Sequence, residues 1–196
     1  MACDGVDLNA DQRPERLHPI AAEFEATPDG LYLRWPRHHP EARLVGSPIG
    51  WSRLRGGDPD AFSPELYLDD DTVVFVSALC HDKLRMTLQQ HRIPMITRRP
   101  VWSLLLDPFL DTDYEIVRER CESRLRECGF DDDEMRAIRA RVAPYADRYV
   151  QLTWEWQDLG EADLIAGYLI DAPDLHAYGK FRRWADHIAA RGEMSS

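Results

Sequence analysis

Helical spacing of apolar residues dominates the second half of the chain. From about residue 69 onward, apolar side chains recur every three or four positions, which places them on one face of a helix. The segments 112–115 and 131–134 both have the form of a capping box, in which the first and fourth residues satisfy each other's backbone groups. They predict two consecutive helices separated at Gly129, a residue that commonly ends a helix.

The same spacing predicts several shorter helices. The expected segments are 82–91, 101–106, 162–170 and 175–190. Together these elements favour a mainly α-helical fold whose helical part runs from about residue 69 to residue 192. We expect one globular domain over residues 29–196, with a small β element and long loops contributed by its N-terminal part.

The N-terminal third of the chain lacks this helical spacing. Residues 1–28 are polar and contain three prolines, so we expect a loose arm with one helical turn near residues 20–24. Residues 31–35 then alternate apolar and polar side chains, as a strand does. Residues 36–66 hold five prolines and predict a long connection, with a short strand at 42–45.

The apolar run at residues 73–79 fits two structures. A short run of valines, phenylalanine and leucine suits either a buried strand or a buried helix, because periodicity cannot separate the two. If it is a strand and residues 95–97 form another, the chain holds a βαβ unit at 73–97 and the fold is α/β. That arrangement is the alternative to the mainly α-helical fold.

A second ambiguous stretch lies at residues 150–157. Read as a strand, it places Trp154 and Trp156 on one face, whereas a helix places them about 160° apart. We predict a helix, because Pro144 suits its first turn and Gly160 the position after its last. The expected helical stripe consists of Tyr145, Tyr149, Leu152, Trp156 and Leu159. Trp154 then lies opposite this stripe, either in the core or on the surface.

The net charge of the chain indicates which classes of partner it favours. Acidic residues number 35 and basic residues 24, which gives a net charge of −11 at neutral pH. Such a chain repels phosphate backbones, so nucleic acid is an unfavourable partner and a basic protein a favourable one. Only Lys83 and Lys180 are lysines, a preference for arginine that is typical of G+C-rich bacterial genomes.

Other features describe the expected cellular setting. The four cysteines have no C-x-x-C spacing, and the acidic N-terminus lacks the apolar segment of a signal peptide. No stretch of about 18 apolar residues occurs, so we expect a soluble cytoplasmic protein that does not contact the membrane. Glycine-rich phosphate loops and the usual hydrolase and zinc-protease motifs are missing from the sequence, and we expect no cofactor.

The leading functional hypothesis is a non-enzymatic protein that binds another protein, as a regulator, inhibitor or immunity-type factor. It depends on the acidity of the chain and on aromatic side chains that could anchor an interface. Trp154 and Glu155 are the predicted binding residues.

The alternative hypothesis is a metal-assisted hydrolase. Asp107, Asp111 and Asp113 place three carboxylates within seven residues, and oxygen ligands of this kind suit Mg²⁺ or Ca²⁺. His81 or His91 would complete the site. The same aspartates can equally end one helix and begin the next, since negative charge stabilises a helix N-terminus.

Overall fold

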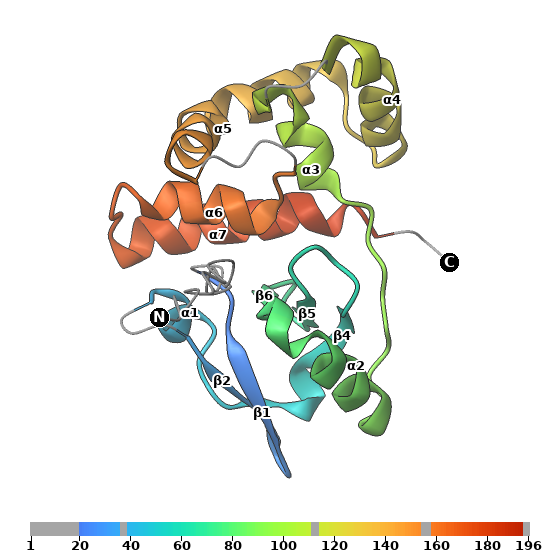
Figure 1. The fold of residues 1–196 in the computed structure, drawn as a ribbon, viewed down its shortest axis with the longest axis vertical. Helices are drawn as coiled ribbons and strands as arrows, with labels where there is room; N and C mark the ends of the chain where they lie inside the picture. The colour runs from blue at the N-terminus through green and yellow to red at the C-terminus, as the bar shows by residue number, and fades with distance from the viewer. Residues whose placement is uncertain (1–19, 36–38, 111–113, 154–157, 194–196) are drawn as a thin grey trace, which may run out of the picture.

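A computed structural model describes residues 20–35, 39–110, 114–153 and 158–193 (Figure 1). Over these residues the protein is mainly α-helical with two small antiparallel sheets of three strands, which confirms the coarse prediction. We call residues 20–97 the N-terminal half and residues 98–193 the C-terminal half. None of the helices in the described part is long and apolar enough to cross a lipid bilayer.

The N-terminal half contains the strands and two short helices. Its elements are β1 (Glu23–Thr27), β2 (Gly30–Arg34), α1 (Glu41–Leu44), β3 (Ile49–Gly50), β4 (Leu54–Asp58), β5 (Glu65–Leu68), β6 (Val73–Phe75) and α2 (His81–Gln90). The C-terminal half consists of α3 (Val101–Leu106), α4 (Tyr114–Glu127), α5 (Asp132–Thr153), α6 (Glu161–Leu169) and α7 (Leu175–Ala190). Three single 3-10 turns are η1 (Trp51–Arg53), η2 (Ala78–Cys80) and η3 (Asp107–Phe109).

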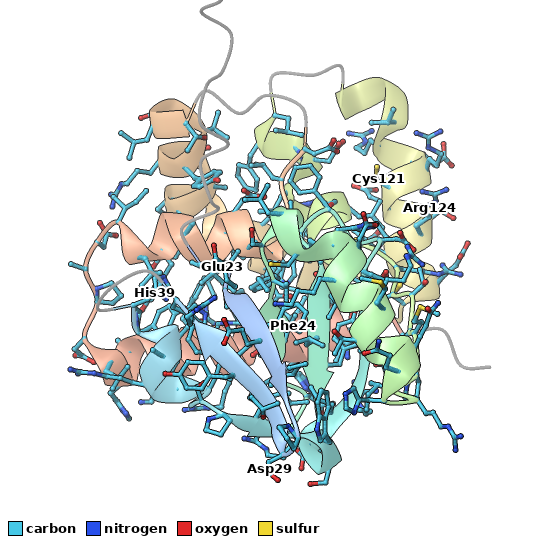
Figure 2. All side chains as sticks on the ribbon, turned by 60° about the horizontal axis from the view of Figure 1, so that its bottom comes forward. Glu23, Phe24, Asp29, His39, Cys121 and Arg124 are labelled. Carbon is cyan, nitrogen blue, oxygen red and sulfur yellow. The ribbon has the colours of Figure 1, made fainter. Side chains whose placement is uncertain are left out.

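The elements form three layers (Figure 1). Helices α6 and α7 cross the middle of the molecule, with the strands and α2 on one side and α3, α4 and α5 on the other. Figure 2 shows Glu23 and Phe24 on β1 and Asp29 at the tip of the β1–β2 hairpin, whereas Cys121 and Arg124 lie on α4. Buried residues of α6 and α7 share one core with α3, α4 and α5 on one side and with β5 and β6 on the other.

A short bridge joins the two sheets. Their strand orders are β1-β2-β3 and β4-β5-β6. The Ala22 amide donates to the Phe75 carbonyl at 2.8 Å, and the Ser77 amide donates to the Ala22 carbonyl at 2.9 Å. The residue before β1 thus pairs with the end of β6.

This pairing corrects part of the predicted N-terminal arm. Ile20, Ala22 and Phe24 are at most 1% exposed, and β1 begins at Glu23, so residues 20–28 are neither loose nor helical. The segment is extended, and Ile20 and Ala21 pack into the core shared with the helices, whereas Ala22 and Phe24 pack into the core shared with α2. Residues 1–19 lie outside the described part of the chain.

Strands β5 and β6 are buried on both faces. One face packs into the core shared with the helices, through Tyr67, Val73 and Phe75. The opposite face packs into a second core with α2, through Leu66, Leu68, Val74 and Val76. A strand buried on both sides has apolar residues at every position, which is why the run at 73–76 lacks alternation. The segment is a strand followed by η2, and not a helix.

The predicted βαβ unit is wrong in its pairing. Strand β6 pairs antiparallel with β5, and Met95 forms only an isolated parallel bridge with Gly57 of β4. Strands β4 and β5 therefore lie between the two segments that the βαβ alternative makes neighbours.

Residues 39–66 are more regular than predicted. The expected strand at 42–45 is instead helix α1. Pro40 already has helical φ and ψ, and Glu41 accepts a hydrogen bond from Arg182 of α7. Strand β4 escaped prediction because glycines are poor strand formers. At Gly57 the close packing requires a glycine, because a Cβ there would lie 2.8 Å from the Glu65 carbonyl oxygen of β5.

The structure has helices over the predicted segments of the C-terminal half, with two differences in the segment 144–159. Residues 158–160 are not helical, so Leu159 is not part of the predicted helix, and Gly160 is the N-cap residue of α6 instead of following that helix. Helix α5 continues through Pro144 instead of starting there, because a long buried stripe that includes Val142 and Ala146 holds it against its neighbours. The segment 150–153 is helical, as predicted. Leu152 is nevertheless 62% exposed, and Tyr149 and Val150 make the buried contacts in its place.

Candidate ligand-binding pocket

A pocket of about 290 Å³ opens between the two halves of the molecule. Its walls come from the loop between β4 and β5, the connection to α3, and the N-terminus of α6. Its charged lining residues are Asp58, Asp60, Glu65, Arg98, Arg99, Glu161 and Asp163, and its aromatic ones are Phe62, Tyr67, Phe75 and Trp102. We call it the interface pocket. Its volume is close to the lower end of the range for small-molecule sites.

The β4–β5 loop forms the rim of the interface pocket. Asp58 ends β4 and is 6% exposed, and its Oδ1 accepts a hydrogen bond from the Asp60 amide at 2.9 Å. Asp60 accepts from the Arg85 guanidinium and lies 3.2 Å from His81 Nε2. Phe62 follows on the same loop with 72% of its surface exposed. The rim thus combines a tethered carboxylate with a free aromatic ring.

Glu65 and Tyr67 form one wall. They are two residues apart on β5 and share a face, and the Tyr67 hydroxyl donates to Glu65 Oε2 at 2.9 Å. The Arg98 guanidinium stacks over the Tyr67 ring, 3.7 Å from its centroid. Arg98 is also committed to Glu193, whose Oε1 accepts from its Nε at 3.1 Å and its Nη2 at 2.7 Å. Among the described residues, Tyr67 is the one hydrogen-bonding partner of the Glu65 carboxyl.

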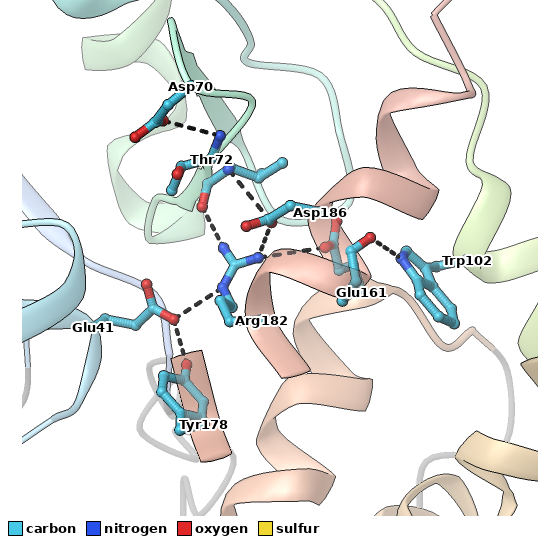
Figure 3. A network of polar contacts seen from close by, with 10 residues as sticks. Glu41, Asp70, Thr72, Trp102, Glu161, Tyr178, Arg182 and Asp186 are labelled. Carbon is cyan, nitrogen blue, oxygen red and sulfur yellow. Dashed lines mark hydrogen bonds and ion pairs between the residues drawn. The ribbon is translucent and has the colours of Figure 1, made fainter. Parts of the chain in front are cut away.

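A buried ionic cluster joins α7 to α1 and α6 (Figure 3). The Arg182 guanidinium of α7 donates through Nε to Glu41 Oε1 at 2.9 Å and through Nη1 to Glu161 at 3.4 Å and to Asp186. Their side chains are 3–5% exposed. We call Arg182, Glu41, Glu161 and Asp186 the Arg182 cluster. It contains three carboxyl groups and one guanidinium, so it carries excess negative charge unless carboxyl groups bind protons.

The cluster also fastens the two halves together. Arg182 donates to the Val73 carbonyl of β6, and Asp186 accepts from the Val73 amide at 3.4 Å. Glu41 of α1 accepts from the Tyr178 hydroxyl on α7. Two elements of the N-terminal half are thereby bound to one helix of the C-terminal half.

Burial shifts the acid–base equilibria of these groups. Desolvation raises the pKa of Glu65 to about 7, against the lowering effects of the Tyr67 hydrogen bond and of Arg98. Burial likewise raises the pKa of Asp186 to about 6, and burial and the Asp186 charge raise that of Glu161. Burial also raises the pKa of Asp58. Protonated carboxyl groups are therefore available at this interface near neutral pH.

The pocket is suited to a cation. Five acidic side chains line it against two basic ones. Both basic side chains have acidic partners outside the pocket, Arg98 with Glu193 and Arg99 with Glu127. Glu193 also pairs with Arg55, and Arg98 Nη1 is buried without a hydrogen-bond partner in the described part of the chain. The aromatic rings on its walls and rim add faces that attract positive charge. A lysine or arginine side chain has the charge and shape to enter.

The predicted protein-binding residues lie outside the described part of the chain. Trp154 and Glu155 follow α5 directly, so their placement stays a prediction. The last turn of α5, which precedes them, presents the exposed Leu152.

The predicted metal site is described only in part. Asp107 lies in η3 with Oδ2 4.0 Å from Cys121 Sγ of α4, whereas His81 begins α2 in the other half and contacts Asp60 and Asp82. Asp111 and Asp113 are outside the described residues. Within the described residues, no three acidic, histidine or cysteine side chains are arranged to hold a metal ion.

Comparison with protein-family models, with curated proteins and with solved structures finds no match for this chain.

Sequence reasoning missed both the interface pocket and the Arg182 cluster. Tyr178, Arg182 and Asp186 recur at every fourth position, which reads as an exposed helix face with one ordinary ion pair. The available signal was their place on α7 among Phe181, Ala185 and Ile188, all buried. No local pattern marks Glu65 as part of a site.

Proposed function

We propose that the protein acts by binding a basic partner protein, and that the interface pocket receives a lysine or arginine side chain of that partner. The excess of carboxyl groups in a pocket whose arginines are already paired carries this proposal. The overall charge of −11 would attract a basic protein at long range and speed the encounter.

Glu65 is the group expected to hold the incoming cation. Its carboxyl has one described partner, and it lines the pocket while its neighbours are engaged elsewhere. A guanidinium or ammonium group that donates to it would form a charge-assisted hydrogen bond in a partly dry site. Such bonds contribute roughly 1.5–3 kcal/mol, or about tenfold or more in affinity.

Phe62 is the rim residue expected to contact the body of the partner. Its exposed ring lies on the loop that forms the pocket mouth, and aromatic side chains are enriched in protein interfaces. The proposed surface therefore consists of an acidic pocket with an aromatic contact beside it.

A defined peptide pair tests the proposal. Calorimetry would compare a glycine-flanked arginine peptide with the same peptide carrying citrulline, which has the same shape without the charge. We expect the arginine peptide to bind more tightly, and binding to weaken as salt rises. Glu65→Gln should weaken it about tenfold, and Phe62→Ala should weaken peptides that extend beyond the pocket.

The matched control is the same substitution, glutamate to glutamine, at a residue outside the pocket. Glu23→Gln removes one negative charge from β1, where Glu23 is exposed beside Arg34. It should leave peptide binding within about twofold of the wild type, since Glu23 does not line the pocket. Equal loss in both variants, or equal binding of arginine and citrulline peptides, would contradict a pocket-specific site.

The end of α5 supports a second contact for the same function. Leu152 is exposed there, next to Trp154 and Glu155, so an apolar side chain precedes the indole that the sequence predicts as an anchor. A partner that fills the pocket and also meets this helix end would bury more area than the pocket alone provides.

A further inference from the structure

The charges around Glu65 do not balance. Arg98 faces it from the connection to α3 but is held by Glu193, and Arg182 faces it from α7 but is surrounded by three carboxyl groups. Both cations favour the ionised form of Glu65 electrostatically, but among the described residues neither donates a hydrogen bond to its carboxyl group.

Other acidic groups increase the imbalance. Asp58 at the end of β4 and Glu161 at the start of α6 both line the same pocket, and each acts electrostatically with Glu65. Tyr67 donates one hydrogen bond to the carboxyl, which is the sole compensation on its own strand. An ionised Glu65 would be a partly desolvated charge beside charges of the same sign, a state that costs free energy.

We propose that a cation entering the interface pocket displaces a proton from Glu65, so that binding and proton release occur as one step. This inference rests on the proposed function. The O–H bond of the Glu65 carboxyl breaks, its proton passes to the solvent buffer, and the N–H of the incoming cation donates to the carboxylate. One positive charge replaces another at the same oxygen atoms.

The acid–base equilibrium of the site agrees with this exchange. Burial raises the pKa of Glu65 to about 7, so the carboxyl holds its proton over the mildly acidic range. If only the ionised form binds the cation, affinity should be on the order of thirtyfold lower at pH 5.5 than well above pH 7. The protein would release a basic partner on acidification.

Calorimetry in buffers of different protonation enthalpy measures the exchanged proton directly. The probe is the arginine peptide with the full-length protein, and the slope of observed heat against buffer enthalpy gives the number of protons released. We expect about one proton released per peptide at pH 6, falling toward zero at pH 8.5. Glu65→Gln should remove both the slope and the pH dependence of affinity, whereas Glu23→Gln should keep both.

The outcomes separate the two proposals. Binding of the arginine peptide without proton release would overturn the coupling and leave the proposed function standing. Failure of that peptide to bind at any pH would overturn both. If the slope persists in Glu65→Gln and disappears in Glu161→Gln, the released proton comes from Glu161, which would contradict its assignment to Glu65. If Glu65→Gln does not fold, the wild-type slope between pH 5.5 and 8.5 still decides the matter.

Discussion

A guanidinium buried with three carboxyl groups makes Arg182 a residue on which both halves of the molecule depend. It loses its hydration on folding and regains polar contacts from α1, β6, α6 and α7. A buried group of this kind contributes less through net attraction than through the penalty of removing it, since its partners are then left charged and unpaired.

We therefore expect Arg182→Met to lower the free energy of unfolding by about 3–5 kcal/mol, measured by urea denaturation. Arg136→Met is the matched control, because Arg136 pairs with Asp133 on the surface and is 73% exposed. It should change stability by less than about 0.5 kcal/mol. A much smaller loss of unfolding free energy in Arg182→Met would mean that the carboxyl groups of the cluster take up protons when the guanidinium is removed.

Glu65 should also affect stability, with a definite sign. Its pKa is raised from 4.5 to about 7 on folding, so the folded state holds the proton more tightly than the unfolded chain. Its contribution is fully present below about pH 4.5 and is lost as pH rises through about 7. The unfolding free energy of the wild type, minus that of Glu65→Gln, should fall over this range.

Glu193 provides the opposite case. Hydrogen bonds from Arg98 and Arg55 lower the pKa of Glu193, despite its partial burial. Its contribution should therefore be present at neutral pH and be lost as pH falls below about 4.5. Equal pH profiles for Glu65→Gln and Glu193→Gln would contradict the assignment of the two environments.

At the scale of elements, the helices with long apolar repeats could be predicted from sequence, and most of the short strands could not. The helices α2, α4, α6 and α7 and the start of α5 were predicted from apolar spacing and capping residues, because these signals are local. The Asp131 carboxylate, for example, accepts from the Glu134 amide at 2.8 Å, as the predicted capping box requires. Strands β5 and β6 are buried on both faces and so lack the alternation that identifies a strand, and the glycines of β4 conceal that strand in the sequence.

Helix α5 shows how tertiary packing overrides a local signal. Pro144 lacks an amide hydrogen and ordinarily marks a helix start, yet α5 passes through it, since residues on both sides of it are buried on one stripe. The predicted stripe also failed at Leu152, where the helix reaches the edge of the core. Only contacts from other elements could have revealed either feature.

The end of α5 is also where Trp154 can be tested. If Trp154 is a surface anchor, Trp154→Ala should leave the free energy of unfolding within about 1 kcal/mol of the wild type and weaken binding of a protein partner. Truncating a core tryptophan instead costs about 3–5 kcal/mol. Loss of that size with unchanged binding of a partner would place Trp154 in the core and remove it from the proposed surface.

At the scale of the whole molecule, the candidate pocket depends on chain segments that are distant in sequence. Glu65, Arg98 and Glu161 come from three separate regions, and the charges of the Arg182 cluster come from α1, α6 and α7. Composition indicated an acidic protein with a basic partner, but the position of the acidic groups emerges only when the two halves pack. The mainly helical class was predictable, and the site was not.

The two-sided burial of β5 and β6 has a consequence for synthesis of the chain. The face that carries Val73 and Phe75 is covered by helices translated much later, and Asp186, which binds the Val73 amide, follows it by 113 residues. A ribosome-bound chain that already contains both sheets still exposes this apolar face until α7 emerges. Nascent chains halted before α7 should therefore require chaperones to stay soluble, although most of the protein has been made.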